Sequence, residues 1–123
     1  MARQPLPTDY QVTVEGIGTF TFMRRRMREE MAIAAEYSRM TEGVDVPTAW
    51  LDNVAGWIAQ LKTLTVYAPS GWTLDLDLMD PEDDETYQRL IRVHGALRAK
   101  EASFRRKPES QGEESGASAQ GNA

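Results

Sequence analysis

The sequence predicts an α+β fold, mainly α, with an N-terminal β-hairpin followed by three helices and a disordered C-terminal tail. Apolar and polar residues alternate between Val12 and Phe22, and apolar residues recur at helical spacing in three later segments. The last residues are rich in Gly, Ser and Glu and contain no large apolar side chain. We therefore expect a flexible leader over residues 1–9, a single domain over residues 10–107 and a disordered tail over residues 108–123.

The predicted hairpin consists of two short segments in which every second residue is apolar. Val12 and Val14 alternate with polar residues in the first segment, and Phe20 and Phe22 alternate with threonines in the second. The residues at 16–18, Gly-Ile-Gly, supply a flexible turn between them. Because an isolated two-stranded hairpin is marginal in water, its apolar face must lie against helices or against another chain.

The first helix is expected from about Arg26 to Met40, and Gly43 is expected to end it. Its apolar stripe consists of Met27, Met31, Ala34 and Ala35, widened by Ile33, Tyr37 and Met40. The second helix is expected to begin with Pro47 in its first turn. It is the predicted centre of the core, because apolar groups cover more than one of its faces: Trp50, Leu51, Val54, Trp57, Ile58, Leu61 and Leu64. Its end is left open by the β-branched residues that follow, and a turn is expected over residues 69–71.

The third helix is expected to start at Asp80, where a capping side chain, a proline and several carboxylates come together. Its predicted inner face consists of Tyr87, Leu90, Ile91, His94, Leu97 and Phe104. The cations at 105–107 suit its negative C-terminal end.

Composition and charge exclude several functional classes. The chain has no cysteine, which rules out disulfides, thiol nucleophiles and cysteine metal sites. A net charge of −5 gives no general attraction for nucleic acid. The sequence has neither a bilayer-spanning apolar stretch nor a signal-peptide pattern, so we expect no membrane association and a cytoplasmic location.

No catalytic, metal or cofactor site can be recognised in the sequence. The acidic stretch from Asp75 to Glu85 invites comparison with a calcium loop, but Asp80 and Thr86 stand where such a loop needs glycine and glutamate. His94 is the single histidine, and on an apolar face it is expected to be a packing residue. There is no dinucleotide or phosphate-binding glycine motif. We therefore expect no cofactor and no enzyme activity.

The cations Arg24, Arg25 and Arg26 allow two interpretations. They oppose the dipole of the helix that follows, so either nearby glutamates neutralise them or they form a patch for an acidic partner segment or phosphate. The tryptophans are likewise either core residues or, with the methionines of the first helix, parts of an adaptable apolar groove. The candidate partner-binding residues are Phe20, Phe22, Arg24, Arg25, Met27, Met31, Trp50 and Trp57.

Over roughly residues 10–105, the chain resembles the tail assembly chaperones of long-tailed, siphovirus-like phages and prophages. The resemblance is carried by the segments GIGTFTFMRRRMREEMAIAAEYSRMTEGV, PTAWLDNVAGWIAQLKTLTVYAPSGW and DPEDDETYQRLIRVHGALRAKEASFR. It implies a small, mostly helical, non-catalytic protein that binds the tape-measure protein and the tail tube protein during assembly. The alternatives are a structural head-tail connector or minor tail subunit and, with less support, a small DNA-binding regulator. Whether the hairpin pairs within one chain or between copies stays open.

Overall fold

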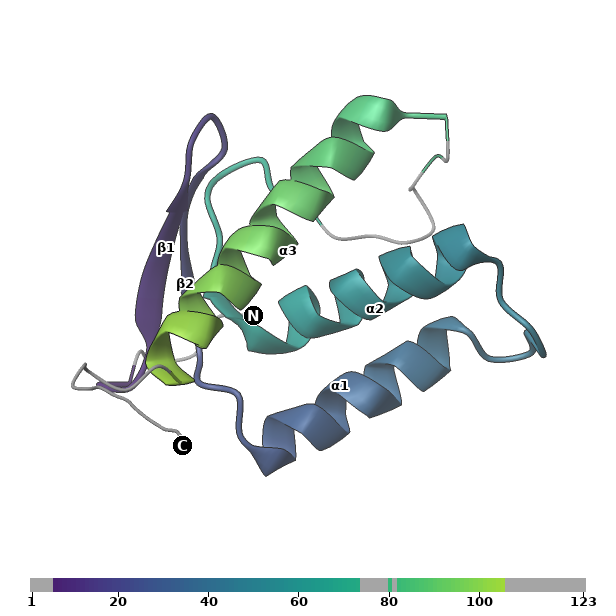
Figure 1. The fold of residues 1–123 in the computed structure, drawn as a ribbon, viewed down its shortest axis with the longest axis horizontal. Helices are drawn as coiled ribbons and strands as arrows, with labels where there is room; N and C mark the ends of the chain where they lie inside the picture. Colours follow the sequence, from purple (N-terminus) through teal and green to yellow (C-terminus); the bar gives the residue numbers. More distant parts are fainter. Residues whose placement is uncertain (1–5, 74–79, 81, 106–123) are drawn as a thin grey trace, which may run out of the picture.

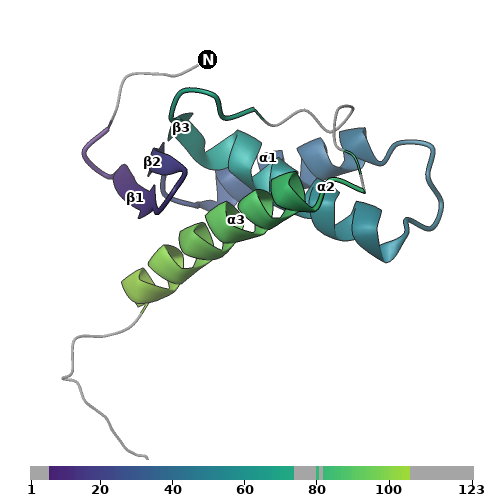
Figure 2. The ribbon, with the colours of Figure 1, turned by 90° about the horizontal axis from the view of Figure 1, so that it is seen from above.

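The computed structural model describes residues 6–73, 80 and 82–105, and it confirms the α+β fold with an N-terminal hairpin and three helices. The elements are β1 (Tyr10–Val14), β2 (Gly18–Phe22), α1 (Met27–Met40), α2 (Ala49–Leu64), β3 (Thr65–Tyr67) and α3 (Asp84–Arg105). Figure 1 shows the sheet at one side of the helices, with α1 and α2 running antiparallel and α2 lying between α1 and α3. Figure 2 shows α3 extending past the sheet at its C-terminal end.

The hairpin pairs within the chain and gains a third strand. β1 and β2 are antiparallel, with Val12 opposite Phe20, and β3 pairs with the other side of β2. The sequence did not predict β3, because the β-branched residues after α2 only left the end of that helix open and three residues are too few to show an alternating pattern. The backbone N–H of Met23 also donates to the carbonyl of Leu64, at 2.8 Å, where the chain leaves α2. The sheet therefore has three strands, with β2 in the centre and β3 contributed by the segment after α2.

Residues from the sheet, α2 and α3 form one hydrophobic core. The largest fully buried side chains are Phe20, Phe22, Val54, Ile58, Leu61, Leu64, Leu90, Val93 and Leu97. They confirm α2 as the centre of the core, since it supplies residues that pack toward both the sheet and α3. The apolar face of the hairpin is thus covered by helices of the same chain.

Two helices begin later than the sequence predicted. α2 begins at Ala49 because the hydroxyl of Thr48 accepts from the backbone N–H of Leu51, at 3.1 Å, so Pro47 precedes the cap. α3 begins at Asp84, because the helix is capped by Asp83, whose carboxylate accepts from the backbone N–H of Thr86 at 3.2 Å. The carboxylate of Asp80 caps a preceding turn instead and accepts from the backbone N–H of residue 82 at 2.9 Å.

The predicted apolar stripe of α1 is divided between two sides of the helix. Ile33, Tyr37 and Met40 are half-buried, and Ile33 and Met40 pack against the core. The other four apolar residues of the stripe, Met27, Met31, Ala34 and Ala35, are exposed. The single-stripe interpretation was wrong, because α1 has a helix on only one side.

Ionic contacts hold the inward side of α1 against α2. The carboxylate of Glu36 on α1 lies 2.9 Å from the ammonium of Lys62 on α2 and also accepts from Arg39. Hydrogen bonds from Arg39 and Lys62 lower the pKa of Glu36 to about 2. These contacts keep the opposite side of α1 directed away from the domain.

Parts of the predicted ends lie outside the described residues. Residues 1–5 of the predicted leader and all of the predicted tail at 108–123 belong to these parts, so neither prediction is tested there. Within the leader, Leu6 and Asp9 form a turn closed by two hydrogen bonds. Among the described helices, none has the length and apolar character needed to cross a membrane.

Candidate functional site

Phe20 and Phe22, two of the candidate partner-binding residues, are fully buried. Both have 0% exposure and lie on the face of β2 that α2 and α3 cover. Their rings stack on each other with centroids 5.7 Å apart, and the ring of Trp72 meets Phe20 edge-on at 5.2 Å. A partner cannot contact either side chain in this fold, so their assignment to the binding surface is corrected to the core.

Trp50 and Trp57 are half-buried and pack against the core. The ring of Trp57 lies 5.8 Å from that of Tyr87 and 5.8 Å from that of His94, both on α3. This position favours the core interpretation of the tryptophans and separates them from the methionines that were expected to share a groove with them. Met40 also packs inward.

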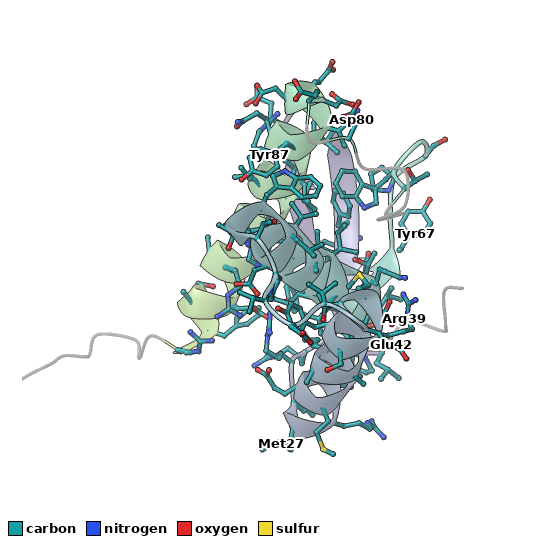
Figure 3. All side chains as sticks on the ribbon, turned by 90° about the vertical axis from the view of Figure 1, so that its right-hand side faces the viewer. Met27, Arg39, Glu42, Tyr67, Asp80 and Tyr87 are labelled. Carbon is teal, nitrogen blue, oxygen red and sulfur yellow. The ribbon has the colours of Figure 1, made fainter. Side chains whose placement is uncertain are left out.

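Met27 and Met31 lie on the side of α1 that faces away from α2. Their exposed fractions are 75% and 67%, high values for large apolar side chains. Ala34 and Ala35 are also exposed and share this side, because residues three and four apart lie on one face of a helix. Figure 3 shows Met27 at the N-terminal end of α1, pointing away from the body of the domain. We call Met27, Met31, Ala34 and Ala35 the methionine face.

Arg25 belongs to a buried ion pair and is not a free cation. Its guanidinium donates to both carboxylate oxygens of Glu101, at 2.9 and 3.2 Å, and to the side chain of Gln60 at 2.7 Å. The side chains of Arg25 and Glu101 are only 11% and 7% exposed. The pair joins the linker between β2 and α1 to the end of α3. It neutralises one cation of the triplet, mainly through Glu101 rather than through the sequence neighbour Glu30, which lies 3.7 Å away.

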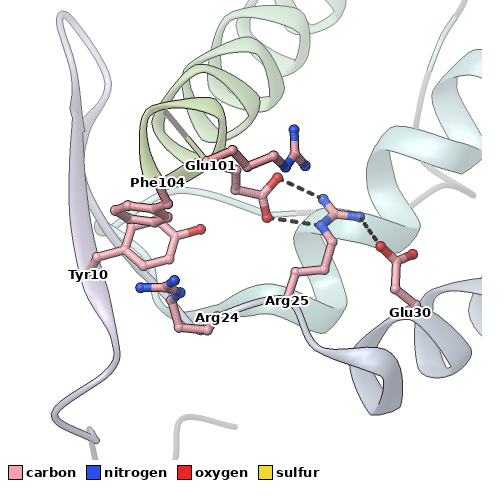
Figure 4. Close-up of a pocket in the computed structure, with 7 residues that line it drawn as sticks. Tyr10, Arg24, Arg25, Glu30, Glu101 and Phe104 are labelled. Carbon is pink, nitrogen blue, oxygen red and sulfur yellow. Dashed lines mark hydrogen bonds and ion pairs between the residues drawn. The ribbon is translucent and has the colours of Figure 1, made fainter. Parts of the chain in front are cut away.

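Arg24 lies at the edge of a pocket of about 270 Å³ between β1, the β2–α1 linker and α3 (Figure 4). Its guanidinium carbon stands 4.3 Å from the centre of the Phe104 ring, a cation–π contact. The ring of Tyr10 meets Phe104 edge-on at 4.9 Å. The lining residues are Tyr10, Arg24, Arg25, Glu30, Glu101, Phe104 and Arg105.

Tyr10 brings an unsatisfied donor to this pocket. Its hydroxyl is buried and has no hydrogen-bond partner among the described residues. Burial, followed by the negative charge of Glu101, raises the pKa of Tyr10 to about 12. The hydroxyl therefore stays protonated at neutral pH and can donate a hydrogen bond.

Metal ligation and the protonation of His94 can be described from the structure. No group of three or more histidine, aspartate or glutamate side chains is placed to hold a metal ion in the part of the chain that the structure describes. Burial, with nearby arginines, lowers the pKa of His94 to about 4, so this imidazole is neutral at pH 7. The acidic stretch that was compared with a calcium loop begins with Asp75 and Asp77, and both of these residues lie outside the described part of the chain.

Sequence reasoning missed four residues of the pocket: Tyr10, Glu101, Phe104 and Arg105. One signal was available for Glu101, which follows the core residue Leu97 by four positions and so shares its helical face. A carboxylate in phase with an apolar face indicates a buried cation partner. The identity of that partner, 76 positions away, was not available from spacing.

Comparisons with protein-family models, curated proteins and solved structures found no match to this chain.

Proposed function

We propose that the chain is a non-catalytic binding protein that covers an amphipathic helix of a client, as a phage tail assembly chaperone does. The methionine face carries this proposal, because two large apolar side chains of α1 are mostly exposed to solvent. Methionine is flexible and polarizable, so a methionine surface can adapt to clients of different shape. Cofactors have no role in this function.

The size of the methionine face suits reversible binding. Full burial of one methionine side chain contributes roughly 1.5–3 kcal/mol, so Met27 and Met31 together supply about 3–6 kcal/mol. Ordering of side chains and loss of rigid-body freedom offset much of this gain. A client must therefore add contacts of its own to be held firmly, and it can be released when assembly proceeds.

Charges beside the methionine face provide orientation. The side chain of Arg28 is 87% exposed and that of Glu30 is 53% exposed, and they lie on opposite flanks of Met27 and Met31 along the helix. An amphipathic client helix carries charged residues beside its own apolar stripe. If these charges face opposite charges on the client helix, they would favour one orientation of that helix along α1. They would raise the rate of association more than the affinity.

The resemblance to tail assembly chaperones supplies the identity of the client. On this proposal, the tape-measure protein and the tail tube protein are the partners in the cytoplasm of a bacterial host, and neither nucleic acid nor a membrane is involved. The net charge of −5 agrees with a protein client rather than DNA.

A structural subunit of the virion is the second candidate. It is favoured by the position of β1, which is an edge strand of the described sheet. An edge strand can pair with a strand of a neighbouring subunit. Persistent presence in purified particles would support this role, whereas a chaperone leaves before the particle is complete.

Co-expression with a tape-measure protein and a tail tube protein from the same genomic neighbourhood tests the proposed function. We expect the wild-type chain to recover the tape-measure protein in a soluble complex. The double variant Met27→Gln with Met31→Gln should lose most of this recovery, since glutamine keeps the length and helix propensity of methionine but removes its apolar end. Val46→Gln is the matched control, because Val46 is 84% exposed but lies in the α1–α2 loop. Equal recovery by all three chains would reject the methionine face as the client surface.

A further inference from the structure

The pocket between Tyr10, Arg24 and Phe104 contains donors that the fold does not use. Among the described residues, Arg24 contacts the Phe104 ring but no carboxylate, and Arg105 makes no ion pair. The buried hydroxyl of Tyr10 also lacks an acceptor, and Figure 4 shows it directed into the space between Arg24 and Glu101. Leaving a buried donor unpaired is unfavourable, so an acceptor that enters this space would stabilise the site.

The opposite wall of the pocket is formed by a hydrogen-bonded ion pair. Arg25 and Glu101 satisfy each other through two hydrogen bonds, and Arg98 donates to the same carboxylate at 2.8 Å. Glu101 therefore needs no further partner and leaves the Tyr10 hydroxyl without one. This arrangement ties the linker that carries Arg24 to the helix that carries Arg105, so the two cations start from backbone positions that the ion pair links.

The charge of the pocket selects the kind of ligand. Three arginines and two glutamates line it, which gives a formal net charge of +1. This charge suits a monoanion better than a phosphate dianion. Arginine also binds carboxylates with two parallel hydrogen bonds. Tyr10 and Phe104 add an apolar wall beside these donors, and Phe104 is 38% exposed.

We infer that this pocket is a binding site for a carboxylate of a peptide partner, held by Arg24, Arg105 and the hydroxyl of Tyr10. The carbon atoms next to the carboxylate would lie against the exposed edge of Phe104. This carboxylate is either the C-terminal carboxylate of the partner or the side chain of one of its acidic residues. The inference does not depend on the methionine face or on a phage client.

Nuclear magnetic resonance titration of the full chain tests the site, because the guanidinium Nε–H signals of arginines report directly on bound anions. The probes are N-acetylleucine, which has a terminal carboxylate, and acetyl-Ala-Glu-Ala-amide, which has only a side-chain carboxylate. N-acetylleucinamide is the uncharged match, and inorganic phosphate at equal ionic strength is the second anion. We expect saturable shifts at Arg24 and Arg105 with one or both carboxylates, and the stronger response identifies the source.

Substitutions make the test specific. Tyr10→Phe removes the hydroxyl but keeps the ring, and it should weaken carboxylate binding roughly ten- to hundredfold, the range expected for losing a hydrogen bond to a charged group. Arg24→Gln should weaken it at least as much. Arg28→Gln is the matched control, because Arg28 is 87% exposed and lies outside the pocket lining. A urea unfolding midpoint measured for each variant separates loss of binding from loss of folding.

The inference would be overturned by equal binding of N-acetylleucinamide, by tighter binding of phosphate, or by equal losses in Arg28→Gln and Arg24→Gln. It would also be overturned if Tyr10→Phe folded normally and bound as the wild type does. The double variant Met27→Gln with Met31→Gln should bind the carboxylates normally. Failure of the proposed client surface and failure of this pocket therefore give different results.

Discussion

Replacing Arg25 alone, Glu101 alone, and both together tests how the ion pair holds α3 to the rest of the domain. Arg25→Met leaves the carboxylate of Glu101, which is 7% exposed, without its main partner. Glu101→Leu likewise leaves the guanidinium of Arg25, whose side chain is 11% exposed, without a carboxylate at hydrogen-bond distance. An uncompensated buried charge is strongly destabilising, whereas replacing both charges with apolar side chains of similar volume is often neutral.

The contacts of the ion pair determine how much free energy of unfolding each single substitution should remove. Removal of one partner of a buried ion pair costs about 3–5 kcal/mol, and we expect the lower end for Arg25→Met because Arg98 still donates to Glu101. With a urea m-value of about 1.5 kcal/mol per molar, a loss of about 3 kcal/mol lowers the unfolding midpoint by roughly 2 M. The double variant should be more stable than either single variant.

Urea unfolding followed by tryptophan fluorescence and circular dichroism measures these changes, and the chain's three tryptophans provide the signal. Arg28→Met is the control, because its side chain is 87% exposed and its substitution should change the free energy of unfolding by no more than about 0.5 kcal/mol. The reasoning is refuted if Arg25→Met is as mild as this control, or if the effects of the two single substitutions simply add.

Three further predictions follow from individual residues. Phe22→Ala should lower the free energy of unfolding by about 3–5 kcal/mol in urea, since Phe22 is 0% exposed, and a change below 1 kcal/mol would contradict its place in the core. Gly18→Ala should lower the melting temperature because its Cβ would lie 2.6 Å from the Cβ of Pro69 at a φ of +143°, whereas Gly95→Ala in α3 meets no atom within 4 Å and should raise it. A higher melting temperature for Gly18→Ala would contradict the close approach of Gly18 to Pro69. His94, with a pKa near 4 in the fold against 6.5 in the unfolded chain, should not affect stability above pH 6.5 and should destabilise the fold as pH falls from 6.5 to 4. Removal of this pH dependence in His94→Gln would support the assignment, and a midpoint above 6 for the imidazole signals in nuclear magnetic resonance would refute it.

Local patterns in the sequence were enough to predict most elements of the fold. The alternation of Val12, Val14, Phe20 and Phe22 predicted the hairpin, because one face of a strand must be buried. Dense apolar residues predicted α2 as the centre of the core. Helix starts were less accurate, since Asp80 and Asp83 are both good caps and only the packed structure decides which one begins α3.

The candidate site could be predicted only in part. Met27 and Met31 were named as candidates because methionine is common at adaptable surfaces. Helical spacing alone could not say which side of α1 would meet α2, and their role as binding residues stays a prediction. Phe20 was named as a candidate at the binding surface, but its side chain is buried in the core. The pairing of Arg25 with Glu101 depends on how the chain folds between them, and no local pattern contains that information.

Site-specific photo-crosslinking tests the central claim, client binding through the methionine face, most directly. A benzoylphenylalanine side chain would replace Met31 in one chain and Val46 in another, and each chain would be expressed together with the tape-measure and tail tube proteins. Mass spectrometry would identify the crosslinked protein and the position of the crosslink. We predict crosslinks from position 31 to an amphipathic helix of the tape-measure or tube protein and few from position 46. Absence of client crosslinks at position 31, or equal yields from both positions, would contradict the claim.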